Sequence, residues 1–468
     1  MKKWQFYILL ILVISSCKNE SNPKIDIKED QTLSTKDTTK KDINNGGLLL
    51  PDDFIANVFV DSIGPSRHIA VNENGDIYVK LREPKGSNGN IALRDTSGNG
   101  SADIKKRFGD YPNDGTFATE MRIYNGYLYF SSEQVVYRHK LTESNLIPEG
   151  KPEVVLTDYF PQRWHNAKSL AFDNQGNMYV TFSAPTNACE DPNSKGQIKG
   201  MYPCPGLDVL GSIWKFDANK LNQSQQDGEM FATGIRSMVA ISWNDKENSL
   251  YGVQHGRDYL HNHAPQYYSV WDQAVLPAEE FMKIEEGDNF GWPYSYYDPF
   301  KKEKLVAPEY GGDGITKAEG FKDPIMGLPA HWAPNDLLFY TGNQFPPRYK
   351  NGAFIAFHGS MNRGPYPQAG YVVGFIPFEN GIPRGELEIF ADGFTGKDTV
   401  KTIEDARYRP MGLTQDKDGS IYISESKQGK IWKVIFTGDK KSFGKENLAN
   451  MEKRKSKPYL KIPDKPLN

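Results

Sequence analysis

The chain has 468 residues, of which 38% are hydrophobic and 12% aromatic, and it carries a formal net charge of -3. Because nucleic-acid binding rests on dense contacts from Lys and Arg to phosphate, this charge gives no electrostatic basis for a nucleic-acid partner. The 25 Tyr and 25 Phe residues, together with the lack of long helical periodicities, favour aromatic-packed sheets over a helical core.

The first residues have the features of an export signal. Lys2 and Lys3 precede an apolar run at residues 4–14, and Ser15-Ser16-Cys17 follows. The run is shorter than the roughly 20 helical residues that cross a bilayer core, whereas a charged start and a short apolar core are typical of a cleaved signal. The segment ending at Cys17 resembles a bacterial lipobox, with a membrane anchor as the alternative. We therefore predict a lipoprotein signal peptide at 1–17, lipidation at Cys17 and export to the bacterial cell envelope, either to the outer membrane or to the periplasmic face.

Residues 18–46 are predicted to form a disordered polar linker. They consist mainly of Lys, Asp, Glu, Ser, Thr and Asn, with almost no large apolar residue, so they cannot bury enough surface to order themselves. A flexible chain of about 30 residues spans on the order of 30 Å. Such a linker would hold a globular body clear of a membrane.

A hairpin pattern at residues 163–183 recurs along the chain. It consists of a short apolar run at 169–172, turn-forming residues at 173–177 and a run rich in aromatic and β-branched residues at 178–182. Similar segments lie at 67–79, 121–130, 237–253, 337–357 and 409–423. A repeat of roughly 50 to 70 residues is typical of a propeller, whose blades bury their faces against one another.

The repeat predicts an all-β fold, a six-bladed β-propeller of four-stranded antiparallel blades at residues 47–437. A Lys-rich C-terminal tail follows at 438–468. We expect this tail to be solvated, the alternative being contact with an acidic partner or lipid head groups.

Cys189 and Cys204 are the cysteines that remain besides Cys17. Both lie in a Gly- and Pro-rich loop after the central hairpin, and an exported pair of this kind predicts a disulfide. A zinc site would need further thiol or imidazole ligands, and the loop between the two cysteines contains no His.

Asp95, Asn99 and Asp103 belong to a loop with oxygen-bearing side chains around a tight Gly turn. Calcium prefers such ligands, and the loop resembles the first part of a calcium-binding loop. Ser97 and Asn99 stand in place of carboxylates, and no Glu closes the loop. A structural calcium site and an Asx-rich turn both remain open.

His165 directly precedes the central hairpin. Loops at that end of a propeller line the central pocket, and an imidazole titrates close to physiological pH. His165 is therefore a candidate base, with a hydrogen-bonded loop histidine as the alternative.

Arg407 and Arg409 flank Tyr408 just before the last repeat. In an extended segment, alternate residues lie on the same side, and two such guanidinium groups suit a ligand with several carboxylates. Two solvated arginines are the alternative.

From about residue 50 to 434 the chain resembles the soluble sugar dehydrogenases that use pyrroloquinoline quinone (PQQ), and most closely their sorbosone dehydrogenase-like branch. Each motif is weak alone, and their order and spacing across six repeats carry the resemblance. The motifs are Arg163-Trp-His-Asn, Gly234-Ile-Arg236, Gly287-Asp-Asn-Phe-Gly-Trp-Pro293, His331-Trp-Ala-Pro, Phe339-Tyr-Thr-Gly342, Ala356-Phe-His-Gly-Ser-Met-Asn-Arg363 and Arg407-Tyr-Arg409.

The resemblance implies a quinoprotein oxidoreductase that oxidises an aldose or a sugar aldehyde by hydride transfer to PQQ. His165 stands where the family has its general base, and this base would take the hydroxyl proton of the sugar. Arg236 matches the Arg that faces the reactive quinone oxygen. Arg407 and Arg409 match the pair that binds the cofactor carboxylates.

The resemblance also implies a Ca²⁺ beside the cofactor, held partly by main-chain carbonyls that match His255, Gly256 and Arg257. The ion would act as a Lewis acid. Asn362 stands where a cofactor-binding Lys is usual, with Arg363 as its replacement. These two residues complete the predicted cofactor site.

No Cys-x-x-Cys-His motif for covalent haem occurs, so electrons would pass to a separate acceptor, a cytochrome or a quinone. Two other functions stay open. A calcium-dependent lactonase would share the propeller but has no use for paired arginines. A non-enzymatic glycan-binding lipoprotein would use an aromatic pocket near Trp292, Tyr294, Tyr296 and Trp332 and would need no base.

The lipobox makes a direct prediction about Cys17. In cells fed a labelled fatty acid, the wild-type protein should incorporate label, whereas Cys17→Ser should not, because the thiol that carries the lipid is gone. Cys189→Ser serves as the matched control and should still be labelled. Continued labelling of Cys17→Ser would show that the lipobox has been misread.

Overall fold

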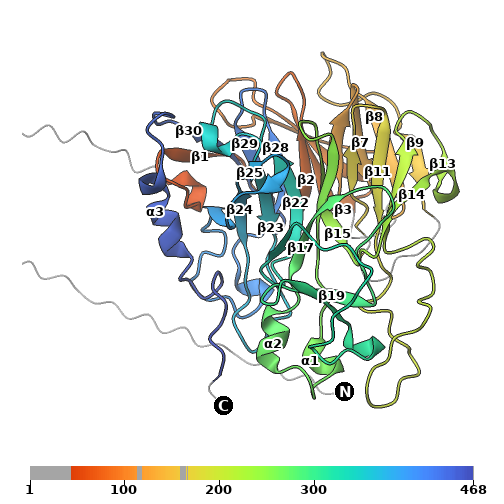
Figure 1. Ribbon diagram of the computed structural model, residues 1–468. Coiled ribbons are helices and arrows are strands. Elements are labelled where there is room, and N and C mark those ends of the chain that lie inside the picture. Colours follow the sequence, from red (N-terminus) through yellow and green to blue (C-terminus); the bar gives the residue numbers. More distant parts are fainter. Residues whose placement is uncertain (1–43, 113–118, 159–164, 166, 467–468) are drawn as a thin grey trace, which may run out of the picture. The chain divides into compact units, whose positions relative to one another are not determined.

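The computed structural model describes residues 44–112, 119–158, 165 and 167–466. The predicted signal peptide, Cys17 and residues 18–43 of the predicted linker lie outside the described residues. Strands dominate the rest, and helices are short (Figure 1). The predicted all-β fold, a six-bladed propeller of mainly four-stranded antiparallel blades, is confirmed.

Each blade runs from an inner strand to an outer strand. Blade 1 contains β2 (Ser66–Val71), β3 (Ile77–Lys85), β4 (Asn88–Arg94) and β5 (Ile104–Phe108). Blade 2 contains β6 (Met121–Tyr124), β7 (Tyr127–Ser131), β8 (Val135–Lys140), β9 (Glu153–Thr157) and the added parallel strand β13 (Gln223–Ser224). Blade 3 contains β10 (Leu170–Phe172), β11 (Asn177–Phe182), β12 (Ser212–Asp217), β14 (Glu229–Thr233) and the added parallel strand β18 (Asp288–Asn289).

The other three blades keep the four-stranded pattern. Blade 4 contains β15 (Met238–Asn244), β16 (Ser249–Gln254), β17 (Glu279–Ile284) and β21 (Met326–Leu328). Blade 5 contains β22 (Pro334–Phe339), β23 (Ala353–Phe357), β24 (Val372–Ile376) and β27 (Glu388–Ala391). Blade 6 contains β28 (Pro410–Gln415), β29 (Ile421–Glu425), β30 (Ile431–Phe436) and β1 (Phe54–Val60).

Blade 6 closes the ring. Its outer strand β1 comes from the beginning of the described chain and pairs antiparallel with β30, starting at the partners Phe54 and Phe436. The two ends of the propeller sequence are therefore held in one sheet. Blade 6 shares a hydrophobic cluster with blade 5 on one side and with blade 1 on the other, so the ring is closed.

The inner hairpins coincide with the repeats seen in the sequence. Gly75, Gly176 and Gly419 occupy the same turn position in blades 1, 3 and 6, with φ of 90°, 96° and 86°. Only glycine adopts this left-handed backbone without a steric penalty. The recurring Gly therefore fixes the register of these three hairpins.

Buried charges connect the blades through the centre of the ring. The Asp336 carboxylate accepts hydrogen bonds from Arg122 Nη2 at 2.7 Å and from the Leu413 main-chain N–H at 2.7 Å. Glu120 lies 3.2 Å from Arg122 Nη1, and His68 Nε2 lies 3.7 Å from Asp336 Oδ1. Burial raises the pKa of Glu120. Arg122 and His68 act in the opposite direction and lower it, but by less. This network joins the inner strands of blades 1, 2, 5 and 6.

The C-terminal segment differs from the expected solvated tail. It contains α3 (Lys445–Arg454), and Met451 and Tyr459 are 2% and 0% exposed. Arg454 Nε and the Tyr459 hydroxyl both donate to Asp392, at 2.6 and 2.9 Å. Apolar residues spaced between the lysines allow this segment to pack on blade 5 while the lysine side chains stay in water.

A helical extension lies at one end of the strands. Figure 1 shows α1 (Leu260–His263), α2 (Val270–Val275) and the two-stranded sheet of β19 (Ser295–Asp298) and β20 (Glu303–Val306) together there. Shorter elements are β25 (Phe378–Glu379), β26 (Ile382–Pro383) and the 3-10 turns η1 (Asn45–Gly47), η2 (Gln225–Asp227), η3 (Pro308–Tyr310), η4 (Pro347–Tyr349) and η5 (Ile403–Asp405). Within the described part of the chain, no helix is long and apolar enough to cross a membrane.

The central network predicts a large stability effect at Asp336. Asp336→Ala should lower the free energy of unfolding by about 3–5 kcal/mol, because it leaves the buried charge of Arg122 without this partner. Urea denaturation followed by circular dichroism measures the change. Asp398→Ala removes an exposed partner of Lys457 and should leave the midpoint nearly unchanged. Equal effects of the two substitutions would contradict a structural role for the network.

Candidate active site

The candidate site lies where the inner strands begin. Each blade is built in the same order from its inner strand outward, so the inner strands start at the same end of the ring. Arg67 lies in β2, His165 and Arg236 precede β10 and β15, and His331 and Arg409 precede β22 and β28. The fold thus places charged side chains from separate blades around one axis.

Arg236 is fixed by three acceptors. It is 2% exposed, and its guanidinium group donates to the main-chain oxygens of Asn187 and Gly256 at 3.2 and 2.9 Å and to Asp258 Oδ2 at 2.9 Å. Burial lowers the pKa of Arg236, and the nearby Asp258 carboxylate acts to raise it. Arg236 therefore presents a positive charge in a fixed orientation.

Asp258 links Arg236 to the next blade. Burial would raise the pKa of its carboxyl, but Arg236 and His331 outweigh burial and hold the pKa far below its usual value. Its Oδ1 lies 3.3 Å from His331 Nδ1. The sequence motifs include His331 but give no reason to single out Asp258, whose role becomes visible only in the structure.

The turn before β22 has a strained backbone. His331 and Ala333 have φ of 63° and 53°, a left-handed conformation that is costly for residues with a Cβ. The turn is held by contacts at both residues: the His331 imidazole faces Asp258, and the Ala333 N–H donates to Glu279 Oε1 at 3.0 Å. The other oxygen of Glu279 accepts the Gly256 N–H at 2.7 Å. Such strain is characteristic of functional sites.

The charges around Arg236 also affect His165. Burial lowers the pKa of its imidazole well below the ordinary value, and the positive charge of Arg236 and the neighbouring His255 lower it further, while Asp258 opposes them. His165 is consequently neutral at physiological pH and able to accept a proton. Arg163, Trp164 and Asn166 of the same motif lie outside the described residues.

A cationic cluster of Arg67, Arg82 and Arg409 lies near the starts of β2 and β28. Arg409 donates from Nε to the His358 main-chain oxygen at 2.9 Å and from Nη2 to that of Gly359 at 2.7 Å. Burial lowers the pKa of Arg67 to about 9, with Arg82 and Arg409 contributing. It lowers the pKa of Arg409 to about 10.

Carboxylates near Arg67 and Arg409 lie beyond ion-pair distance: Glu120 raises the pKa of Arg67 and Glu404 raises that of Arg409, but less than burial lowers them. No ion pair joins Arg67 or Arg409 to a carboxylate among the described residues, and the buried Nε of Arg67 has no hydrogen-bond acceptor there. The pKa of His358 lies well below its ordinary value. Burial is the main cause, and the charges of Arg409 and Arg67 lower the pKa further. Two neighbouring arginines without an ion-paired carboxylate are suited to binding an anion with several carboxylates.

The other predicted cofactor residues lie in different surroundings. Arg407 is exposed, and its guanidinium carbon lies 5.1 Å from the centre of the Tyr408 ring. Asn362 contributes a side-chain hydrogen bond to Asp258. Arg363 is buried and donates to the Ala274 main-chain oxygen at 3.1 Å. Asn362 therefore lies beside the Arg236 group. No described contact joins Arg407 or Arg363 to the Arg67 cluster.

The segment predicted to hold calcium by its main chain has several other contacts. The Gly256 carbonyl accepts Arg236, His255 Nε2 lies 2.8 Å from the Pro334 oxygen, and Arg257 is paired with the buried Glu309. Because a carbonyl oxygen has two lone pairs, Gly256 retains capacity for a second partner. The calcium ion here stays a prediction.

The loop at residues 95–103 has the hydrogen bonds of an Asx-rich turn. Asp95 accepts main-chain N–H groups of residues 97, 98 and 100 at 2.7–3.1 Å, Asn99 accepts that of 101 at 2.8 Å, and Asp103 accepts that of 96 at 3.0 Å. Among the residues that the structure describes, no group of three His, Cys, Asp or Glu could hold a metal. The geometry favours the turn over the calcium site.

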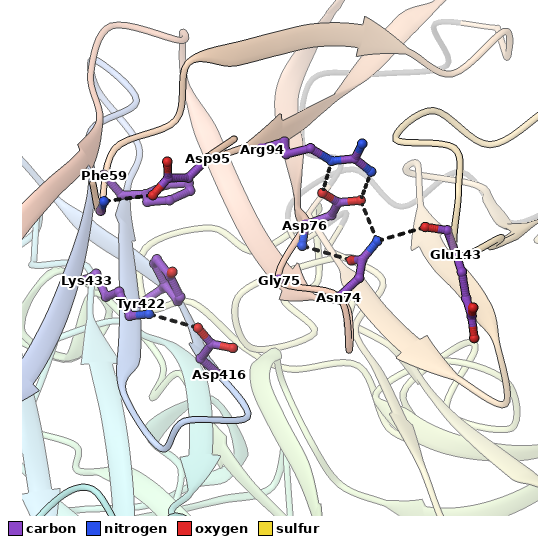
Figure 2. A pocket seen from close by; sticks show the side chains of 11 residues that line it. Phe59, Asn74, Gly75, Asp76, Arg94, Asp95, Glu143, Asp416, Tyr422 and Lys433 are labelled. Carbon is purple, nitrogen blue, oxygen red and sulfur yellow. Dashed lines mark hydrogen bonds and ion pairs between the residues drawn. The ribbon is translucent and has the colours of Figure 1, made fainter. Parts of the chain in front are cut away.

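Asp95 also borders a polar cleft of about 400 Å³ at the turn end of the blade 1 hairpin (Figure 2). Figure 2 shows Arg94 facing Asp76 and Lys433 facing Asp416, at 2.6 and 3.0 Å. The two cations of the cleft are thus each paired with one of its carboxylates, and Asp95 and Glu143 leave it with an excess of negative charge. The cleft lies at the far end of β2 from the predicted base and cofactor residues.

The predicted disulfide is confirmed. Cys189 and Cys204 are bonded, with their Cα atoms 6.0 Å apart. Both pack against Trp292, and the Cys204 N–H donates to the Tyr294 hydroxyl at 3.1 Å. Because Asn187 in the same loop accepts from Arg236 and from Trp292 Nε1, the crosslinked loop forms part of the wall around Arg236.

Sequence comparison relates the chain to a defined family. The TrAA12-like family model matches residues 49–436. An uncharacterized protein of Borreliella burgdorferi is 29% identical over 218 residues, which are 46% of this chain and 51% of that protein, so the alignment spans about half of that relative. A pyrroloquinoline quinone-dependent sugar dehydrogenase of Hypocrea jecorina is 22% identical over 338 residues, 67% of this chain and 72% of the relative.

Solved structures share the fold at low identity. The iodide structure of the Trichoderma reesei family AA12 enzyme has a TM-score of 0.65 at 18% identity and covers 85% of this chain and 100% of its own. The holo PQQ domain of Coprinopsis cinerea pyranose dehydrogenase has a TM-score of 0.63 at 16% identity, with 83% and 97% covered. At these identities the likeness shows the propeller fold.

If the arginine cluster exists to bind a ligand, it should reduce the stability of the protein without that ligand. Arg67→Met should raise the free energy of unfolding by about 1–4 kcal/mol, since it removes a buried charge that two other arginines repel. Urea denaturation at pH 7 measures this, with Arg67→Lys, which keeps a charge, as the matched control. A clear loss of stability in Arg67→Met would mean that the cluster is structural.

Proposed function

Because the chain belongs to the TrAA12-like family, whose model spans residues 49–436, we propose that it is a PQQ-dependent oxidoreductase that acts on sugars. Family membership confirms the resemblance to the PQQ-dependent soluble sugar dehydrogenases. The sorbosone dehydrogenase-like branch stays a prediction. A dehydrogenase of this kind needs a polyanion site, a base and a fixed positive charge beside the reacting atoms.

The observation that carries the proposal is the Arg67 cluster. Arg67 is buried and Arg409 is half-buried, and neither is ion-paired with a carboxylate among the described residues. PQQ has three carboxylates, so its binding would compensate the cluster. We assign the cofactor carboxylates to Arg67 and Arg409, with Arg82 near them. Arg407, from its exposed position, would add a weaker contact.

The residues around Arg236 suit the chemical step. When bound, PQQ supplies a carbonyl that accepts a hydride from a sugar C–H bond. His165, neutral because of burial and Arg236, takes the hydroxyl proton of the sugar on an imidazole nitrogen. Arg236 stabilises negative charge that develops near its guanidinium group. Asp258 and His331 hold Arg236 in place and are positioning residues.

The remaining parts of the proposal rest on the sequence. The substrate is an aldose or sugar aldehyde, and electrons pass to a separate cytochrome or quinone. A Ca²⁺ near Gly256 would accompany the cofactor. The lipobox supports a lipid anchor in the bacterial cell envelope, and no observation on the described residues favours the lactonase or the glycan-binding alternative over the oxidoreductase.

The test separates binding from chemistry. The apoprotein is reconstituted with Ca²⁺, titrated with PQQ by absorbance, and assayed for aldose-dependent dye reduction. His165→Ala should bind PQQ almost normally but turn over about 100-fold or more slowly, the usual effect of losing a general base. His261→Ala, outside the site, should keep its turnover. Wild-type turnover in His165→Ala would exclude this residue as the base.

Arg409→Ala should have the opposite pattern. It removes a charge-assisted contact worth about 1.5–3 kcal/mol, so PQQ affinity should fall roughly 10- to 150-fold and activity should recover at high PQQ. Arg407→Ala removes the same charge from an exposed position and should weaken binding less. If the wild-type protein binds no PQQ, the proposed function is wrong.

A further inference from the structure

A second cavity lies beneath the turn that carries His331 and Trp332. Its volume is about 250 Å³. Apolar residues make up most of its wall, including Val275 of α2, Leu328 of β21, Trp332 and Leu460 of the C-terminal segment. Apolar cavities of about 150 Å³ admit a benzene ring in other proteins. This cavity therefore has room for a ring and a small substituent.

Arg363 brings a buried charge to the cavity. The residue lines the cavity and is 3% exposed. Its Nε donates to the Ala274 oxygen at 3.1 Å, whereas the buried Nη1 has no hydrogen-bond partner among the described residues. Burial lowers the pKa of Arg363 to about 10, so the group stays charged at neutral pH. No carboxylate of the described chain is paired with it.

The rim supports an apolar ligand. Phe300 and Ile462 are large apolar side chains that are 50% and 54% exposed, and both border this cavity. Lys461, the other cation of the wall, is already 3.1 Å from Asp464 Oδ2. Arg363 is thus the buried cation of the cavity that has no paired carboxylate among the described residues, in a wall that is otherwise mostly apolar.

We propose that this cavity binds a small monocarboxylate with an apolar body, such as an aromatic acid, with its carboxylate on Arg363. A carboxylate accepts from a guanidinium group in a geometry that a neutral group cannot reproduce, and the ring fills the space between Trp332, Leu328 and Leu460. The wall of this cavity does not include Arg67 or Arg409. The inference does not depend on the proposed redox function.

Fluorine NMR titration of the full chain with 4-fluorobenzoate tests the proposal. The matched probes are 4-fluorobenzyl alcohol, which lacks the charge, and acetate, which lacks the ring. Saturable binding of 4-fluorobenzoate, with the alcohol at least about tenfold weaker, is expected from a charge-assisted bond. Acetate should fail to compete at equal concentration. Absence of saturable binding, equal affinity of acid and alcohol, or equal competition by acetate overturns the proposal.

Variants locate the binding. Arg363→Gln should weaken 4-fluorobenzoate binding at least about tenfold, whereas Arg384→Gln, which removes a surface arginine of the same blade paired with Glu379, should leave it unchanged. Ala330→Leu fills the cavity while keeping Arg363, and it should abolish binding in a protein whose circular dichroism matches the wild type. Wild-type affinity in either Arg363→Gln or Ala330→Leu would place the ligand elsewhere and overturn the assignment.

Discussion

The closure of the ring by the β1–β30 pair is the constraint on which the rest of the structure depends. It joins Phe54 to Phe436 in one sheet and so holds six blades around an axis. With the ring closed, the starts of the inner strands meet at one end. Polar residues there that are far apart in sequence become neighbours. The buried carboxylates Glu120 and Asp336 then connect several blades through the centre.

Two kinds of buried charge result, and they have different energetic roles. Asp336 and Asp258 are compensated: each faces an arginine within hydrogen-bonding distance. Arg67 is buried and the half-buried Arg409 lies near it, and neither is ion-paired with a carboxylate among the described residues. Compensated charges hold a structure in place, whereas uncompensated ones cost stability, a cost that a bound anion would relieve.

Much of the fold was predictable from the sequence because its repeats are local. A turn glycine between an apolar run and an aromatic run marks several inner hairpins, as at Gly75 and Gly419, and the loop cysteines marked the disulfide. The packed C-terminal segment was missed because its lysines mask the spacing of Met451 and Tyr459.

The candidate site was predicted in part. His165, Arg236 and Arg409 stand in recognisable motifs, but Arg67 was missed, although it begins the first repeat where Arg409 precedes the last. Asp258 and Asp336 carry no local pattern, because only tertiary contacts bury them. Periodicity shows which residues form strands, and it does not show which charges lack a partner.

The central claim is that the arginine cluster binds the carboxylates of PQQ, and an equilibrium titration of the apoprotein with PQQ and with its trimethyl ester tests it most directly. The ester keeps the quinone and removes the negative charges. The account predicts saturable binding of PQQ and binding of the ester at least about 100-fold weaker, as expected for the loss of more than one charge-assisted contact. Equal affinity for the two compounds, or no binding of PQQ, would contradict it.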